Sequence, residues 1–236
     1  MTGPAATAVT FDFGQTLCEL DTAMLSRRLA ERGLDVAEVH LDAALPTALR
    51  AYDAGIRRGL GGHPWKVLMS ELLAHAGAPA LHLEATVDWL WTEQPAQNLW
   101  RRPIAGMIEI ASALRARAIP VGVISNSEGR LAELAAEIGW GDRFQVIADS
   151  GALGLEKPGA AIFAWTAKAL GVPMDTIVHI GDSFAADVEG AVNAGLHAIW
   201  FAAKPGVPLP SRAHAASNAI EVRRALAAIG IDLALD

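Results

Sequence analysis

Hydrophobic residues form five short, nearly continuous runs along this chain, and each run ends at a polar or small residue. The runs are rich in β-branched and aromatic residues. Such composition is typical of strands that are buried on both faces of a parallel sheet. The predicted strands occupy residues 8–13, 120–125, 144–149, 177–182 and 197–201.

Apolar residues before and between the last four runs recur every three or four positions, which is the spacing of amphipathic helices. The stripes run through Ile110, Leu134, Phe163 and Val188, and Gly195 is a suitable helix stop. Strands that alternate with helices predict βαβ units. We therefore expect the α/β class, with an open parallel sheet and helices on both faces.

The segment between the first and second predicted strands is much longer than one crossover helix requires. It contains helical patterns at 23–32, 36–53, 65–75 and 83–91, and no convincing strand between 19 and 101. We therefore expect two domains. Residues 1–17 and 102–236 form the α/β core, and residues 18–101 form an inserted helical domain.

The composition narrows the class of protein. The 236 residues are 52% hydrophobic and 19% charged, which is enough to bury a sizeable core. A net charge of −7 argues against a nucleic-acid partner, and one cysteine excludes an internal disulfide. No apolar run approaches the roughly 18–20 residues that span a membrane, and the N-terminus does not resemble a signal peptide. We expect a cytoplasmic enzyme or binding protein with no membrane partner, and leave its oligomeric state open.

Polar residues follow the predicted strands at the edge where ligands bind in open parallel sheets. Taken singly, each has an ordinary explanation as a helix cap, a turn residue or a solvated side chain. That explanation does not account for the whole set occurring in order at successive strand ends. In chain order, the set is Asp12, Thr16, Ser125, Asn126, Lys157, Asp182 and Asp187.

This ordered set resembles the four motifs of the haloacid dehalogenase superfamily, whose commonest members are magnesium-dependent phosphatases. The resemblance covers the whole chain and implies a Rossmann-like core with the helical cap of the C1-cap subgroup (subfamily I). It also implies residue roles: Asp12 attacks phosphorus, Thr16 helps to hold the phosphoryl oxygens, and Ser125 and Lys157 bind the phosphate. Asp12, Asp182, Asp187 and the main-chain carbonyl of Gly14 are the implied ligands of Mg²⁺.

Elementary electrostatics supports this chemistry. A carboxylate that attacks a phosphate dianion brings two negative charges together, and a hard divalent cation with a lysine relieves the repulsion. We therefore expect Lys157 to pair with Asp12 before substrate arrives. The predicted partner is a phosphorylated small molecule held by Ser125, Asn126 and Lys157. In the insertion, Arg57 and Lys66 lie on a cationic stretch that either reaches a second anionic group or is a solvated helix end.

One position departs from the family pattern. The phosphatases carry a second Asp two residues after the nucleophile, and this chain reads Asp12-Phe13-Gly14-Gln15-Thr16. That Asp protonates the leaving group and later activates water. Gly14 keeps the carbonyl and lacks the carboxylate, and loss of a general acid or base typically costs about 10²–10⁴-fold in rate.

Four outcomes follow from this departure. The substrates have leaving groups that need little protonation, such as acyl phosphates or sugar 1-phosphates; or Glu19, Asp21 or His63 replaces the missing acid. Alternatively, Lys66 forms a Schiff base as in the phosphonatase branch, or the protein is a non-catalytic phosphate-binding module. The dehalogenase branch fits less well, because it works without metal and lacks the acidic fourth motif that Asp182 and Asp187 match.

Overall fold

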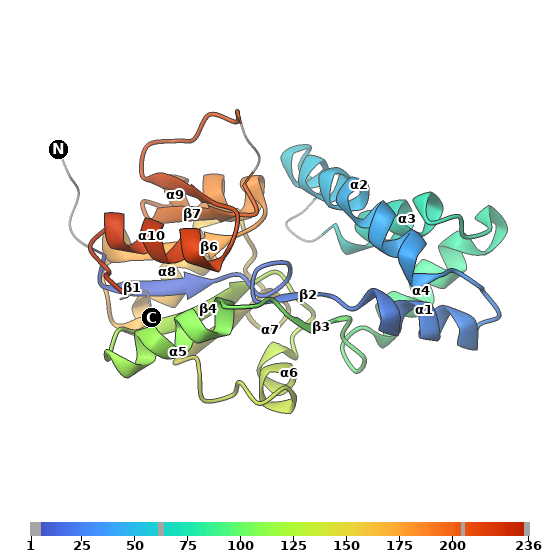
Figure 1. The fold of residues 1–236 in the computed structure, drawn as a ribbon, viewed down its shortest axis with the longest axis horizontal. Coiled ribbons are helices and arrows are strands. Elements are labelled where there is room, and N and C mark those ends of the chain that lie inside the picture. Colours follow the sequence, from blue (N-terminus) through green and yellow to red (C-terminus); the bar gives the residue numbers. More distant parts are fainter. Residues whose placement is uncertain (1–5, 61–63, 204–205, 234–236) are drawn as a thin grey trace. The chain divides into compact units, whose positions relative to one another are not determined.

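The computed structural model describes residues 6–60, 64–203 and 206–233, shown in Figure 1. Contacts between Cα atoms divide the chain into two units. One unit comprises residues 1–19 and 102–236, and the other comprises residues 20–101. We call the first the core unit and the second the helical unit, and describe each by itself.

A six-stranded sheet organises the core unit, and every pairing within it is parallel. The order is β5-β4-β1-β6-β7-β8. From β4 the chain continues to the edge at β5 and then crosses to the far side of β1, so the topology reverses beside β1. The strands are β1 (Ala8–Phe11), β4 (Val121–Ser125), β5 (Val146–Asp149), β6 (Ile177–Gly181), β7 (His197–Phe201) and β8 (Ala213–Ala216).

The five predicted strands are confirmed, and so is the α/β parallel-sheet class. Every residue of β1, β4, β6 and β7 is buried, which explains why these strands read as continuous apolar runs. The sequence analysis missed β8, whose residues Ala-His-Ala-Ala are mostly not fully buried. An edge strand without β-branched residues leaves no such hydrophobic signal.

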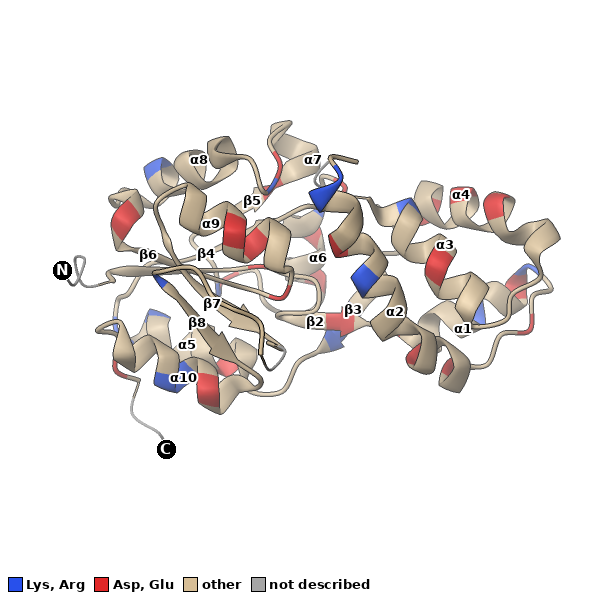
Figure 2. Ribbon diagram, turned by 90° about the horizontal axis from the view of Figure 1, so that it is seen from above, with Lys and Arg blue, Asp and Glu red and all other residues tan. Residues whose placement is uncertain are grey.

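Helices cover both faces of this sheet, as Figure 2 shows. On one face lie α5 (Met107–Ala116) and α10 (Ala219–Ala228), and on the other lie α8 (Ala160–Leu170) and α9 (Gly190–Asn193). The buried stripe of α8 includes Ile162 and Phe163, which pack with Ile124 and Ala198 of the sheet. Two short helices, α6 (Leu131–Glu137) and α7 (Ser150–Leu153), follow β4 and β5.

The helical unit has a hydrophobic core of its own. Leu25, Leu41, Trp65, Leu72 and Leu90 belong to one buried cluster drawn from all four of its α-helices. These are α1 (Thr22–Glu31), α2 (Glu38–Arg57), α3 (Trp65–His75) and α4 (Leu83–Glu93), and the short 3₁₀ helix η1 (Ala80–His82) precedes α4. All four helical patterns of the insertion are therefore confirmed.

The expectation of no strand between 19 and 101 was wrong at both ends of that segment. β2 (Cys18–Leu20) and β3 (Trp100–Pro103) form a two-stranded sheet where the chain passes between the two units. Both strands are short, and β3 contains two arginines and a proline, so neither has the apolar run of a core strand. Within the described chain, no helix combines the length and the apolarity needed to cross a membrane.

Replacing Leu72 by Ala tests the core of the helical unit. Leu72 is fully buried, so Leu72→Ala is expected to lower the free energy of unfolding by about 2–5 kcal/mol through lost burial and a residual cavity. The matched control is Leu81→Ala, because Leu81 is 90% exposed; its effect should stay within about 0.5 kcal/mol. Urea unfolding measures both variants. Equal effects would contradict the assignment of Leu72 to a packed core.

Candidate active site

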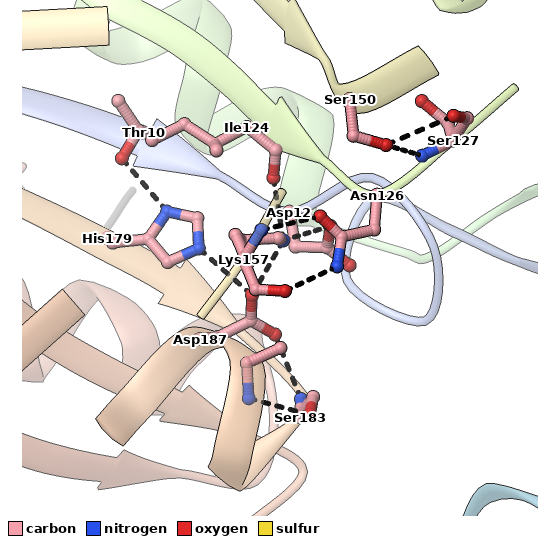
Figure 3. Close-up of polar contacts among 11 residues, drawn as sticks. Thr10, Asp12, Ile124, Asn126, Ser127, Ser150, Lys157, His179, Ser183 and Asp187 are labelled. Atoms are coloured by element: carbon pink, nitrogen blue, oxygen red, sulfur yellow. Dashed lines mark hydrogen bonds and ion pairs between the residues drawn. The ribbon is translucent and has the colours of Figure 1, made fainter. Parts of the chain in front are cut away.

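The side-chain ammonium of Lys157 lies at the centre of a buried polar cluster beyond the ends of β1, β4 and β6 (Figure 3). Its Nζ donates hydrogen bonds of 2.7 Å each to Asp12 Oδ1, Asp187 Oδ1 and the main-chain oxygen of Ile124. Only 2% of the Lys157 side chain is exposed. All three protons of the ammonium are therefore used, and the expected pairing of Lys157 with Asp12 is present.

The main chain of Lys157 is held by Asn126, which follows β4. Asn126 Nδ2 donates to Lys157 O at 2.9 Å, and Asn126 Oδ1 accepts from Lys157 N at 2.8 Å. The sequence analysis assigned Asn126 to substrate binding. Its amide instead makes a two-point contact that fixes the lysine, and a role toward substrate stays a prediction.

Asp187 is presented by a π-helical segment, η3 (Phe184–Glu189), which begins two residues beyond Asp182. Its Oδ2 accepts from the main-chain N–H of Ser183 at 2.9 Å, and the Ser183 hydroxyl oxygen accepts from Ala186 N at 3.1 Å. A Cβ atom on Gly181 would overlap the Asp187 carboxyl group. Glycine at 181 therefore allows this carboxylate to approach the end of β6.

Three carboxylates converge beside the lysine. Asp12, Asp182 and Asp187 each offer an oxygen, and these atoms lie within 4.8 Å of one another. The indole of Trp200, on β7, donates to Asp182 O at 2.8 Å and so holds the main chain of that residue. Carboxylate oxygens at this spacing suit a hard cation such as Mg²⁺.

The electrostatics of the cluster agrees with a cation site. Burial, and then the charges of Asp187 and Asp12, raise the pKa of Asp182 well above its usual value. Burial also raises the pKa of Asp12, although Lys157 acts in the opposite direction. Three carboxylates facing one ammonium leave negative charge without compensation. A divalent cation would cancel it, so these residues fit Mg²⁺.

Asp187 and Lys157 stabilise each other's charged forms. Burial alone would raise the pKa of Asp187, but attraction to Lys157 and a hydrogen bond with His179 hold it below its usual range. Burial alone would likewise lower the pKa of Lys157, but Asp12 and Asp187 raise it. The cluster therefore keeps a protonated lysine and an ionised Asp187 side by side.

The loop after β1 is a tight turn that begins at the proposed nucleophile. Asp12 N donates to Ile180 O at 2.7 Å, and the N–H groups of Leu17 and Cys18 both donate to Phe13 O at 2.9 Å. The left-handed residue of this turn is Gln15, with φ of 55°. The Thr16 hydroxyl is buried and has no hydrogen-bond partner among the described residues, so it is available to a ligand.

Ser125, the last residue of β4, is only 5% exposed. The loop that follows it is organised by Asp149 at the end of β5, which the sequence analysis did not single out. Asp149 accepts hydrogen bonds from the main-chain N–H groups of Gly129, Leu131 and Gly151 at 2.9–3.0 Å. The position of Asp149 at the end of a predicted strand was the only sequence signal that could have indicated this role.

The family model of the haloacid dehalogenase-like hydrolases matches residues 6–195. The chain belongs to this family. It is 25% identical over 204 residues to the mouse haloacid dehalogenase-like hydrolase domain-containing protein 3, covering 82% of this chain and 81% of that protein. It is 35% identical over 68 residues to the Escherichia coli 5-amino-6-(5-phospho-D-ribitylamino)uracil phosphatase YigB, covering 29% of each.

The fold is similar to that of the putative hydrolase YfnB from Bacillus subtilis, a member of this family whose structure was solved bound to magnesium. The TM-score is 0.72 at 19% identity, over 94% of this chain and 99% of that one. The relatives therefore support a haloacid dehalogenase-like hydrolase with a Rossmann-like core, and they include a phosphatase.

This haloacid dehalogenase-like hydrolase has glycine where the phosphatase pattern has its second acid, and two of the three candidate substitutes, Glu19 and Asp21, are engaged elsewhere. Glu19 Oε2 accepts from Arg102 Nε at 2.8 Å in a partly exposed ion pair. Asp21 Oδ1 accepts from Met24 N at 2.7 Å and so caps α1. His63 lies outside the described residues.

The two cationic residues proposed to bind substrate belong to the helical unit. Arg57 forms an ion pair with Asp53 at 3.4 Å, and Lys66 Nζ lies 2.6 Å from Asp88 Oδ1. More than half of the Lys66 side chain is exposed. A Schiff base requires a neutral amine, which enzymes obtain by desolvation or a cationic neighbour. A solvated ion pair with a carboxylate gives the phosphonatase alternative no support.

Asp182→Asn tests the electrostatics of this hydrolase's site. A raised folded-state pKa means that the folded protein binds more protons than the unfolded chain between pH 3.8, the ordinary value, and that raised pKa. Stability contributed by protonated Asp182 is therefore lost as pH rises through this window. In chelator at neutral pH, Asp182→Asn should be more stable than the wild type, and the difference should shrink on acidification.

Added Mg²⁺ should make the wild type more stable than Asp182→Asn, because a ligand stabilises only a protein that binds it. Thermal unfolding with and without Mg²⁺ measures both effects. Asp142→Asn is the control, since 80% of the Asp142 side chain is exposed. This variant should change neither the stability in chelator nor the stabilisation by Mg²⁺. A metal-free Asp182→Asn variant that is less stable than the wild type would contradict the prediction.

Proposed function

We propose that this hydrolase is a Mg²⁺-dependent phosphatase that acts on phosphorylated small molecules through an aspartyl-phosphate on Asp12. The observation that carries the proposal is the buried cluster in which Lys157 contacts both Asp12 and Asp187, while Asp12, Asp182 and Asp187 present oxygens within 4.8 Å. A nucleophile, a fixed positive charge and a set of ligands for a hard cation are the groups that phosphoryl transfer to a carboxylate requires.

The reaction proceeds in two displacements at phosphorus. A carboxylate oxygen of Asp12 attacks the phosphorus, and the bond to the leaving-group oxygen breaks with its electron pair, which then takes up a proton. Water next attacks the phosphorus of the aspartyl-phosphate, its proton is transferred away, and the bond to Asp12 breaks. Inorganic phosphate leaves, and Asp12 is again a carboxylate.

The residues of this chain supply charge and hydrogen bonds to these steps. Lys157 reduces the repulsion between Asp12 and the incoming dianion, and the unpartnered Thr16 hydroxyl is available to a phosphoryl oxygen. Ser125 is proposed to donate from the end of β4. When bound by Asp12, Asp182, Asp187 and the Gly14 carbonyl, Mg²⁺ supplies further positive charge to the phosphoryl group.

Gly14 limits which substrates react well. Because position 14 offers no carboxyl group, leaving groups that are stable as anions should be favoured. Acyl phosphates and sugar 1-phosphates have such leaving groups. YigB is named as a phosphatase of a phosphorylated ribitylamino-uracil, and this similarity supports the wider class of small phosphorylated metabolites as substrates. Gly14 is also the observation that favours the second candidate function, a phosphate-binding module without turnover.

Asp12→Asn tests the nucleophile. Release of phosphate from acetyl phosphate and p-nitrophenyl phosphate is expected in Mg²⁺ and should be abolished by chelation. Asp12→Asn should lower kcat by more than about 10³-fold, because the amide is a poor nucleophile. The matched control Asp142→Asn removes an exposed carboxylate of the core unit and should retain activity. If the wild type releases phosphate from no activated substrate, the binding module is favoured and the phosphatase proposal fails.

Gly14→Asp tests the missing acid. The restored carboxyl group is expected to raise kcat for an unactivated alkyl phosphate by about 10²–10⁴-fold, and to have much less effect on acetyl phosphate, whose leaving group needs no proton. The control Gly141→Asp adds the same charge at an exposed glycine with ordinary space for a Cβ. An equal change for both substrates would show that proton supply does not limit turnover.

A further inference from the structure

His179 is a buried titratable residue that the proposed reaction does not use. It lies on β6, its side chain is fully buried, and both ring nitrogens have partners (Figure 3). Nδ1 is 3.0 Å from Thr10 Oγ1, and Nε2 is 3.1 Å from Asp187 Oδ1. Nothing in the sequence alone places this residue beside Asp187.

The chemistry of these partners determines the tautomer. Asp187 Oδ1 faces Nε2, and the Thr10 hydroxyl, which can donate, faces Nδ1. A neutral imidazole has one donor and one acceptor nitrogen, and an ionised carboxylate only accepts. Nε2 therefore carries the hydrogen and donates to Asp187, and Nδ1 accepts from the Thr10 hydroxyl.

Two further contacts restrict the orientation of the ring. Thr10 and His179 are paired residues of the parallel ladder between β1 and β6, so their side chains lie next to each other. On α8, the Phe163 ring meets the imidazole edge-on, with centroids 5.5 Å apart and planes at 80°. The ring is thus held by neighbours on a strand and on a helix, which is how a hydrogen-bond donor is preorganised.

We propose that His179 is a positioning residue of the active site, which uses its Nε2–H to fix the Asp187 oxygen that also accepts from Lys157. The expected effect of His179 on catalysis rests on the proposed function. Asp187 Oδ1 then has two donors, the ammonium of Lys157 and the imidazole N–H. In the Nε2–H tautomer, the uncharged ring orients the carboxylate without cancelling the negative charge that attracts a cation.

The test compares a variant that removes the donor with one that keeps it. His179→Leu replaces the ring by an apolar side chain, and His179→Gln retains an N–H group at a similar reach. His197 offers matched controls, because it is a buried histidine on the neighbouring strand β7 and its ring nitrogens have no partner in the described part of the chain. Mg²⁺ affinity is measured by calorimetry. The values of kcat and KM are measured from the steady-state hydrolysis of p-nitrophenyl phosphate.

His179→Leu is expected to weaken Mg²⁺ binding and to lower kcat, each by about 10–100-fold, the usual effect of losing a hydrogen bond that orients a ligand. KM should change less than kcat. His179→Gln should recover most of both losses, and the His197 variants should leave both quantities close to wild type. Equal losses in His179→Leu and His179→Gln, or normal Mg²⁺ affinity in His179→Leu, would overturn the inference.

A measurement on the unaltered protein covers the case in which His179→Leu does not fold. Two-bond ¹H–¹⁵N correlation spectra distinguish the tautomers of a neutral imidazole, and the Nε2–H form is expected for His179. The Nδ1–H form would overturn the inference, because Nε2 could not then donate to Asp187. Mg²⁺ affinity and tautomer do not depend on turnover. A wild type that binds Mg²⁺ but releases no phosphate would therefore refute the phosphatase proposal and leave this test intact.

Discussion

The buried ammonium of Lys157 is the interaction on which the rest of the active site depends. A charge removed from water costs several kcal/mol unless it is paired and hydrogen-bonded. This one is satisfied by Asp12 after β1, Asp187 from η3 and the main-chain oxygen of Ile124 in β4. Three segments that are distant in sequence must therefore meet at one atom, and removal of the ammonium would leave Asp12 and Asp187 side by side without their shared counter-charge.

The parallel sheet explains why much of this could be predicted from the sequence. Its central strands are buried on both faces, so they appear as apolar runs, and their carboxyl ends share one edge, where Asp12, Ser125 and Asp182 were expected. The contributions that were missed depend on pairing in space. The register of β1 and β6 brings Thr10 to His179, and the loop after β4 brings Asn126 to the main chain of Lys157. Neither hydrophobic periodicity nor spacing encodes such contacts, and β8 carries no β-branched or large apolar side chain by which it could be recognised.

Gly14 separates two requirements of phosphoryl transfer that usually occur together. The electrostatic requirement is met, since the lysine and the three carboxylates are assembled. The requirement for a proton donor is not met at position 14, and Glu19 and Asp21 are engaged with Arg102 and with the first turn of α1. A site with the first property and without the second discriminates between leaving groups by their acidity. Substrate choice would then be set in part by the core unit, through the proton that it does not supply.

The acidic cluster also bears on the choice between enzyme and binding module. A site that only binds phosphate is better served by cations and N–H donors, because carboxylates repel the ligand. Here Asp182 is partly buried beside two other carboxylates, and its raised pKa reflects the cost of ionising it there. A divalent cation bound by these carboxylates would offset that cost and would change the sign of the local field from repelling phosphate to attracting it. The cluster thus makes physical sense as one half of the proposed metal–phosphate site, with Asp12 as the proposed nucleophile.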